Sequence, residues 1–144
     1  MVYLLYFFNQ ILMNKYFTDS FKVDQNAIDG LNHVNNVIYL DWAQKIAEKH
    51  WSQLSNTTIN NNFVWVVKRH EVDYFLPVFL NDKITLKTYI GESYGVKSER
   101  FVNVLKNDKL VCSVKTTWIL LEKATMKPVR IPSEILTLLN SNKL

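Results

Sequence analysis

The sequence predicts a single α+β domain in which a curved antiparallel sheet wraps around one long helix. One long stretch with helical periodicity is followed by several long stretches rich in β-branched and aromatic residues. The strand and helix patterns do not alternate along the chain, as they would for a parallel sheet, and no internal repeat is visible. With 144 residues, the chain has the length of one domain with a sizeable core.

The part of the chain before the helix predicts a short strand and then an irregular loop. Residues 16–23, YFTDSFKV, have the composition of a first strand. Residues 24–36 are rich in Asn and Asp, whose side chains bond to the nearby backbone and favour turns and caps over regular structure. Asn35 or Asn36 is a suitable N-cap for the helix that follows.

The helix is expected over residues 37–54. Its apolar positions recur at helical spacing, so that one face can pack against a sheet. That face holds Tyr39, Ala43, Ile46, Ala47, His50 and Leu54. The following residues, 55–62, are rich in Asn and Thr and are expected to form a loop.

Four long strands are then expected in an antiparallel meander. Residues 83–90 show the clearest alternation, with Ile84, Leu86, Thr88 and Ile90 on one face. Asn107 and Asp108 form a tight turn between two of the strands, and Ser133 caps a short terminal helix. The four strands are predicted at residues 63–75, 83–90, 97–106 and 109–122.

Residues 1–14 form an apolar N-terminal extension that is set apart from the domain at residues 15–144. The first thirteen residues are apolar and aromatic but too short for a membrane span of about 20 residues. They also lack the basic start and small-residue cleavage site of a signal peptide. Three interpretations stay open: an amphipathic segment docked on the domain, a membrane-surface anchor, or residues upstream of a true start at Met13.

Composition and motifs exclude several classes of function. Lys and Arg are scattered, without a basic run or a nucleic-acid-binding motif, and the net charge of +4 is that of a slightly basic surface. Cys112 is the single cysteine, so the chain has no internal disulfide and a reducing, cytoplasmic setting is expected. The sequence has no Gly-x-Ser-x-Gly elbow, no Gly-rich phosphate loop and no His or Cys spacing typical of a metal site.

Residues 29–40, DGLNHVNNVIYL, resemble the signature of 4-hydroxybenzoyl-CoA thioesterase-like hotdog proteins. That signature reads Asp, two residues, Gly-His-Val-Asn-Asn, two residues, Tyr. Residues 69–77, RHEVDYFLP, and the end of the last strand are similar to the family as well, so the resemblance covers about residues 15–135. Two positions depart from the pattern: Asn32 replaces a Gly, and Ala27 stands where a second Asp is common. The resemblance implies the hotdog fold.

The resemblance also implies thioester hydrolysis, with Asp29 as general base or nucleophile. It places an oxyanion donor at the backbone N–H near Asn36, and a helix N-terminus has the unpaired N–H groups and positive dipole that this requires. His33 would support catalysis, whereas Asn35 and Tyr39 would contact substrate. Each of these residues also has a purely structural interpretation. Asp29 could form a turn and His33 could be a hydrogen-bonding loop residue. Asn35 could cap the helix, and Tyr39 could pack in the core.

An acyl-CoA is the expected substrate, and an acyl-carrier-protein thioester is the alternative within the same chemistry. From a different class comes a non-catalytic acyl-CoA-binding module. No cofactor, metal ion or nucleic acid is expected, and the protein should form a homodimer or a dimer of dimers, because hotdog relatives pair their sheets. Arg100, with Lys97 and Arg130, is a candidate for CoA phosphates, although a solvated strand face is the simpler interpretation for each.

Overall fold

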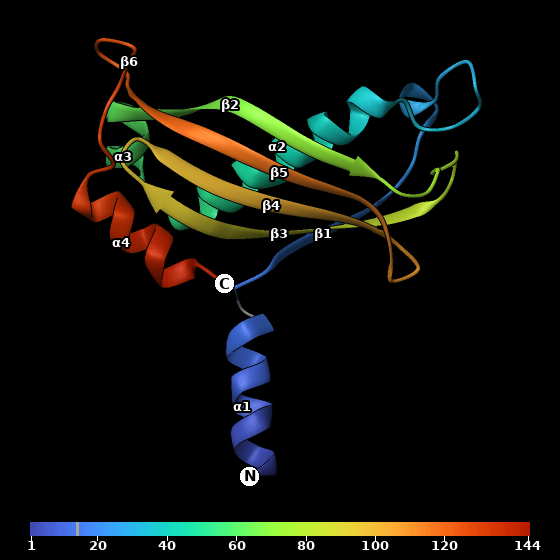
Figure 1. The fold of residues 1–144 in the computed structure, drawn as a ribbon, viewed down its shortest axis with the longest axis horizontal. Helices are drawn as coiled ribbons and strands as arrows, with labels where there is room; N and C mark the ends of the chain where they lie inside the picture. Colours follow the sequence, from blue (N-terminus) through green and yellow to red (C-terminus); the bar gives the residue numbers. More distant parts are fainter. Residues whose placement is uncertain (14) are drawn as a thin grey trace.

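The computed structural model describes residues 1–13 and 15–144, and the side chains of residues 11–13 lie outside that description. The helices are α1 (Val2–Met13), the 3-10 helix η1 (Gln25–Ala27), α2 (Asn36–Leu54), α3 (Thr57–Asn62) and α4 (Ser133–Asn142). The strands are β1 (Phe17–Lys22), β2 (Phe63–Tyr74), β3 (Lys83–Tyr94), β4 (Lys97–Lys106), β5 (Lys109–Glu122) and β6 (Lys127–Pro128). Figure 1 shows the sheet in front of α2, with α4 at one end and the loop before α2 at the other.

The strands form one sheet in the order β1-β3-β4-β5-β2, and β6 adds a short pairing to β5. The expected four-strand meander is therefore only partly right. Strands β3, β4 and β5 are consecutive neighbours, but β2 pairs antiparallel with β5 at the far side of the sheet. The pairing of β2 joins residues that are 38 to 59 positions apart in the chain, such as Trp65 and Leu120, and no local pattern encodes such a partner.

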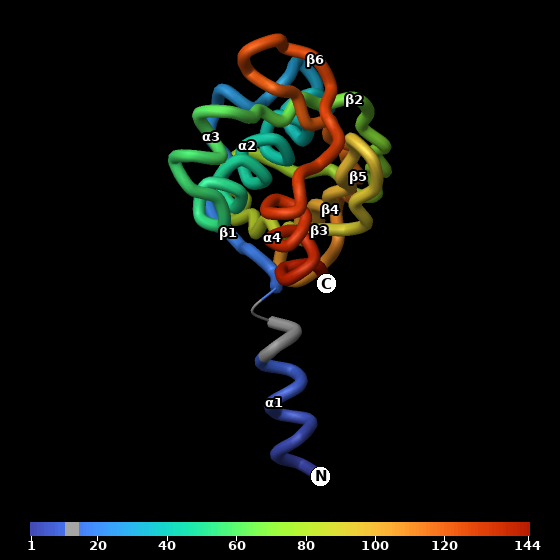
Figure 2. Tube along the Cα trace, turned by 90° about the vertical axis from the view of Figure 1, so that its left-hand side faces the viewer, coloured from blue at the N-terminus to red at the C-terminus, as the bar shows by residue number. Residues whose placement is uncertain are grey.

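The sheet curves around α2, as the sequence predicted. Figure 2 shows this curvature in a view from one end of the sheet. The expected face of α2 is buried at Tyr39, Ala43, Ile46, Ala47 and His50. On β3, the predicted inward residues Ile84, Leu86, Thr88 and Ile90 are all at most 4% exposed. The apolar face of the helix and the inward face of the sheet therefore pack against each other, which holds α2 against the sheet.

The core consists of two apolar clusters with buried polar side chains between them. The first cluster lies under the first half of α2 and includes Val34, Ala43, Val78, Ile84 and Val104. The second cluster lies where α3 and α4 cover the other end and includes Ile59, Ile90, Leu120, Ile135 and Leu139. The buried polar residues are His50, Thr88, Ser98, Arg100 and Thr116. We call these five residues the polar layer.

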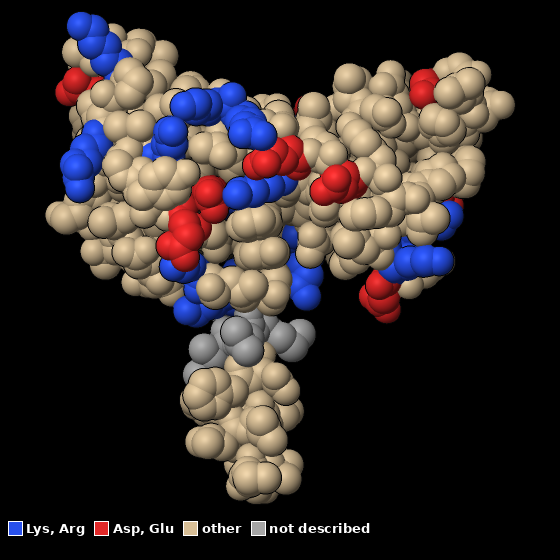
Figure 3. All heavy atoms as spheres, in the orientation of Figure 1, with Lys and Arg blue, Asp and Glu red and all other residues tan. Residues whose placement is uncertain are grey.

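Helix α1 extends away from the domain (Figures 1 and 2). Its apolar side chains from Val2 to Phe8 are 59–90% exposed, so the structure does not support the docked interpretation. Figure 3 shows no charged side chain on the visible face of α1, in agreement with its sequence, VYLLYFFNQILM. No helix in the described part of the chain is long and apolar enough to cross a membrane.

Two local predictions were wrong. Residues 57–62 were expected to be a loop but form α3, because Asn56 accepts a hydrogen bond from the Ile59 N–H at 2.9 Å and Ile59 is only 2% exposed. Ser133 is the first residue of α4 and not its cap. Pro132 holds the cap position without a side-chain hydrogen bond, in keeping with its fixed φ and its missing N–H.

Candidate active site

The loop before α2 folds into a narrow hairpin that carries the predicted catalytic residue. Ile28 and Val34 form an isolated antiparallel bridge, and the Asp29 N–H donates to the His33 carbonyl at 3.0 Å. Asn32 closes the hairpin with φ of 63°, a left-handed conformation that Asn tolerates better than most residues. Asn32 therefore serves where the family pattern has Gly.

Asp29 sits at the start of this hairpin, where a hydrogen bond from the backbone holds one of its carboxylate oxygens. Oδ1 accepts a hydrogen bond from the Leu31 N–H at 2.9 Å, and Oδ2 lies 3.6 Å from His33 Nδ1. The side chain of Asp29 is 24% exposed and that of His33 is 32% exposed. Asp29 is thus held by its own loop while it stays accessible to water, which a general base or nucleophile requires.

The start of α2 lies directly after the hairpin. The Asn35 side chain accepts from the Val37 N–H at 3.2 Å, and its carbonyl accepts from the Ile38 N–H at 2.9 Å. Asn35 is therefore the N-cap, and Asn36, the other candidate from the sequence, is the first residue of the helix. Among the described residues the Asn36 N–H has no intramolecular acceptor, so it is a free donor at the positive end of the helix dipole.

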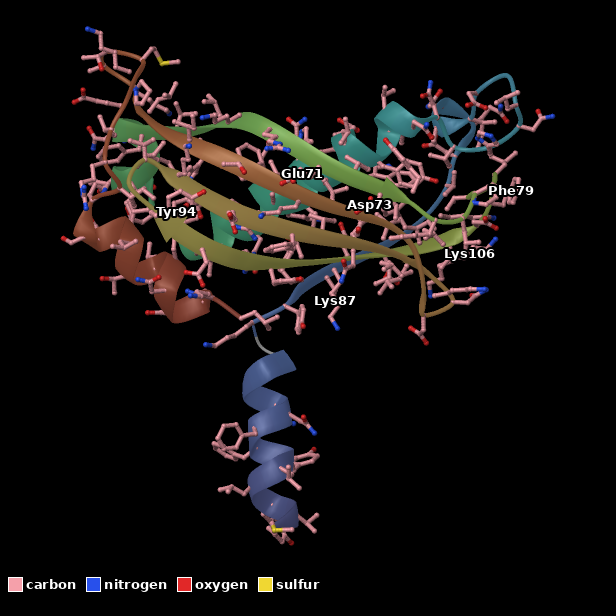
Figure 4. The ribbon with its side chains drawn as sticks, in the orientation of Figure 1. Glu71, Asp73, Phe79, Lys87, Tyr94 and Lys106 are labelled. Atoms are coloured by element: carbon pink, nitrogen blue, oxygen red, sulfur yellow. The ribbon has the colours of Figure 1, made fainter. Side chains whose placement is uncertain are left out.

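The connection from β2 to β3 fixes the hairpin in place. The Val34 N–H donates to the Val78 carbonyl at 2.8 Å, which ties the end of the hairpin to this connection. Asp82 closes the connection by accepting from the Phe79 N–H and pairing with Lys106, at 2.8 and 2.7 Å. Figure 4 shows Phe79 beside Lys106 at this end of the sheet. Partial burial opposes ionisation of Asp82, but these donors hold the pKa of its carboxyl below the ordinary value.

A pocket of about 220 Å³ opens beside the hairpin. It is lined by His33, Val34, Asn36 and Tyr39 on one side and by Tyr74, Phe75, Leu76 and Pro77 on the other. Asp29 is not part of the wall but lies against His33 through its Oδ2. The pocket therefore lies between the predicted residues and the end of β2, where Tyr74 is the last residue of the strand.

Tyr74 was not singled out from the sequence, although it lies inside the RHEVDYFLP motif. Its hydroxyl donates to the Asn36 carbonyl at 2.9 Å, and its ring packs edge-on against Tyr39 with centroids 5.4 Å apart. Tyr39 is only 3% exposed, and burial above all raises its pKa to about 12. Tyr39 is thus chiefly a core residue at the base of the pocket, with a protonated phenol at neutral pH.

Arg100 lies apart from this site. It is buried against the other half of α2, where its Nη1 is 2.6 Å from His50 Nδ1. The expectation of a solvated strand face was wrong for Arg100, because strand alternation directs the side chains at positions 98, 100 and 102 towards α2. Of the predicted site residues, the structure therefore groups Asp29, His33, Asn35, Asn36 and Tyr39 at one end of α2 and leaves Arg100 out.

Comparison with known proteins agrees with this fold. A predicted thioesterase from Bacillus stearothermophilus superposes with a TM-score of 0.79 at 18% identity, covering 90% of this chain and 97% of that one. A 1,4-dihydroxy-2-naphthoyl-CoA thioesterase from Synechocystis gives 0.75 at 17% identity, covering 87% and 96%. A thioesterase from Thermus thermophilus, solved with coenzyme A and Zn, gives 0.77 at 21% identity, covering 88% and 92%. None of the curated proteins compared with the chain matches it.

The model of the thioesterase-like superfamily matches residues 23–139, which is most of the chain. Fold and family together define a hotdog protein that is a thioester hydrolase, as the sequence resemblance implied. The chain belongs to the thioesterase-like superfamily. Within the described residues, no group of three His, Cys, Asp or Glu side chains is arranged to hold a metal ion.

Proposed function

We propose that the protein hydrolyses acyl-CoA thioesters, with Asp29 as general base or nucleophile and the Asn36 N–H as oxyanion donor. The supporting observation is the hairpin that places an oriented, water-accessible carboxylate next to a helix start with a free N–H. His33 lines the pocket, and its Nδ1 lies 3.6 Å from Oδ2 of Asp29, where it can support the carboxylate. Asn35 acts by capping the helix, which keeps the donor at position 36 in place.

The reaction balances with these groups alone. As a general base, Asp29 takes a proton from water while the oxygen attacks the thioester carbonyl. The developing oxyanion is stabilised by the Asn36 N–H and the helix dipole. The C–S bond then breaks, and the leaving thiolate takes the proton held by Asp29, giving the free acid and CoA. As a nucleophile, the Asp29 carboxylate would attack the carbonyl carbon and the C–S bond would break, which releases the CoA thiolate, protonated by water, and leaves a mixed anhydride; water then hydrolyses the anhydride to the free acid and the Asp29 carboxylate.

Coenzyme A as the carrier is suggested by structurally similar proteins. The Thermus thermophilus thioesterase and a protein from Staphylococcus aureus were both solved with CoA, and the Synechocystis relative acts on a CoA ester. The mild positive charge of this chain suits an anionic carrier. Cys112 is a buried, free thiol, in keeping with the reducing cytoplasmic setting that the sequence favours.

The proposal is tested by measuring thiol release from short, medium, long and aromatic CoA esters and from matching carrier-protein esters. Asp29→Asn should lower turnover by about 100-fold or more, the usual scale of acid–base catalysis, with little change in substrate affinity. Asp24→Asn is the matched control, because Asp24 belongs to the same loop and only caps η1 through the Asn26 N–H at 2.9 Å. It should keep near-full activity, since Asn is also a good cap.

Two results would contradict this mechanism. If Asp29→Asn hydrolysed the esters as fast as the unmodified protein, Asp29 would be neither base nor nucleophile. If the unmodified protein bound acyl-CoA tightly but hydrolysed none of the esters, the chain would be an acyl-CoA-binding module. Faster turnover of carrier-protein esters than of CoA esters would overturn the choice of carrier alone.

We also infer a homodimer, formed through the outer edge of β2. In the described sheet β2 pairs only with β5, so a row of backbone N–H and C=O groups stays unpaired along its other edge. Tyr74 and Phe75, at the end of this edge, line the pocket. Sedimentation at micromolar concentration should therefore show a species of at least twice 17.0 kDa, and a monomer alone would contradict the inference.

A further inference from the structure

A second cavity, of about 320 Å³, lies at the opposite half of α2 from the hairpin. Asn36 and His50 are fourteen residues apart on α2, which corresponds to about 21 Å along a helix. The two cavities share no lining residue. The volume is within the range of small-molecule sites, about 300–1,000 Å³. The second cavity is therefore large enough for a ligand of its own.

Four aromatic side chains line this cavity. Trp51 comes from α2, Phe63 and Trp65 from the start of β2, and Trp118 from β5. Trp51 and Trp65 pack edge to face with centroids 5.9 Å apart. Such walls bind flat or flexible hydrocarbon by area burial and by contacts with the rings.

One buried cation also lines the cavity. Arg100 is 6% exposed, and its side chain contacts the His50 ring, with Nη1 2.6 Å from Nδ1. Because Nδ1 accepts this hydrogen bond, His50 is neutral. Burial, with the nearby Arg100, lowers the pKa of His50 to about 4, and burial lowers the pKa of Arg100 to about 10. At neutral pH the pair therefore carries one positive charge.

That charge has no acidic partner among the described residues. Glu99, next in sequence, points to the other face of β4 and pairs with Lys115 at 3.3 Å. At the cavity the exposed Glu48 and the exposed Lys123 offset each other, which leaves Arg100 as the net charge of the site. A buried charge without a counter-charge is costly, so an anionic ligand would be strongly favoured here.

An unsatisfied hydrogen-bond donor lies beside Arg100. Within the described structure the buried Trp118 Nε1–H has no hydrogen-bond acceptor. Ser98 is paired with Trp118 across β4 and β5, and Arg100 with Thr116, so Arg100 and Trp118 are diagonal neighbours on the same inner face. A buried indole N–H usually finds a partner. The same cavity thus holds a cation without a counter-charge and a donor without an acceptor.

We propose that this cavity binds an apolar monocarboxylic acid, with its carboxylate on the Arg100 guanidinium and its hydrocarbon against Trp51, Phe63 and Trp65. Arg binds a carboxylate through charge-assisted hydrogen bonds, which are stronger than neutral ones. The site is separate from Asp29 and does not depend on thioester hydrolysis. An acid bound here would contact the start of β2 as well as the end of α2.

The test is the binding of octanoate, followed by tryptophan fluorescence, because three of the four Trp residues line this cavity. Octanoate should bind about tenfold or more tightly than 1-octanol, the scale of a hydrogen bond to a charged group. Acetate, which has no hydrocarbon to bury, should bind more weakly than octanoate. Equal affinity for octanoate and octanol would overturn the proposal, as would failure of octanoate to bind.

Variants then locate the site. Arg100→Gln should abolish the preference for octanoate over octanol, whereas Lys123→Gln, which removes an exposed cation from the same cavity, should preserve it. Asp29→Asn should also preserve it, so failure of the proposed hydrolysis would not affect this result. If octanoate binding survived Arg100→Gln unchanged, the acid would bind elsewhere. If Arg100→Gln did not fold, NMR on the unmodified protein would locate the bound octanoate. Magnetisation should then transfer from octanoate protons to the indole protons of Trp51, Trp65 and Trp118. Absence of this transfer would overturn the proposal.

Discussion

The Tyr74 hydroxyl donates a hydrogen bond to the backbone carbonyl of Asn36 across 2.9 Å, which connects the last residue of β2 to the first residue of α2. This contact holds the start of the helix against the sheet at the point where the Asn36 N–H is free. It links a strand edge that we assign to the dimer interface with a donor that we assign to catalysis. Tyr74 is therefore a candidate positioning residue.

Tyr74→Phe should lower turnover on the order of tenfold, because small displacements of a donor weaken transition-state stabilisation. The free energy of unfolding should fall by only about 0.5–1.5 kcal/mol, the net value of one hydrogen bond, since Tyr74 is 44% exposed. Tyr94→Phe is the matched control, as Tyr94 is exposed at the far end of β3 (Figure 4). Kinetics that are equal for both variants would rule out a positioning role for Tyr74.

Asn32→Gly should keep both stability and turnover, because Gly adopts the left-handed conformation of Asn32 and adds at most about 1 kcal/mol of chain entropy. Asn32→Val should cost about 1–2 kcal/mol or more, since a β-branched residue is strained there. Turnover should fall with it, because the hairpin carries Asp29. Chemical denaturation and ester hydrolysis check both effects, and a Val variant as stable as the Gly variant would contradict the hairpin geometry.

The polar layer predicts a loss of stability in mild acid. Burial and Arg100 lower the pKa of His50 from 6.5 to about 4, so between these values the unfolded chain binds more protons than the folded one. The free energy of unfolding therefore falls as pH drops from 6.5 towards 4, by up to about 3 kcal/mol for the full shift. Burial also lowers the pKa of His70, which adds in the same direction.

Urea denaturation at pH 7 and at pH 4.5 measures this loss. His50→Gln removes the titrating ring, so its stability should depend less steeply on pH than that of the unmodified protein. The contribution of His70 is present in both proteins and cancels in the comparison. If the two proteins lost the same free energy between these pH values, His50 would not be the group responsible.

A chain that starts at Met13 should keep its fold and its activity. The side chains of residues 1–10 are exposed, so removing them should change the free energy of unfolding by less than about 1 kcal/mol. A loss of several kcal/mol would place the aromatic residues of α1 in a core. Comparing the binding of both chains to lipid vesicles tests the anchor interpretation, which requires the full chain to bind and the shortened chain not to.

Local patterns were sufficient to predict the elements that carry the site. The spacing of Tyr39, Ala43 and Ile46 predicted the buried face of α2, and the Asn-rich stretch predicted its cap, since both depend on residues within a few positions. The tight turn between β4 and β5 was confirmed by left-handed φ values of 50° and 61° at Asn107 and Asp108. The catalytic role of Asp29 was predicted from the resemblance to the thioesterase family and not from the spacing of residues.

Features that depend on distant residues were beyond the sequence patterns. The pairing of β2 with β5 and the contact of Tyr74 with Asn36 join segments that are far apart in the chain. Helix α3 forms in a stretch of weak helix formers because Ile59 enters the core. The burial of Arg100 likewise depends on the curvature of the sheet around α2, because this curvature places the inward face of β4 against the helix.

The polar layer separates two ends of the domain that should tolerate substitutions independently of each other. Residues around the hairpin and residues around the second cavity belong to different apolar clusters and share no wall. Substitutions more than about 10 Å apart without common partners usually combine additively. Changes that enlarge or reshape one end can therefore accumulate without compensation at the other, so ligand preference at Trp51 and Trp65 is free to diverge while the loop around Asp29 stays constant.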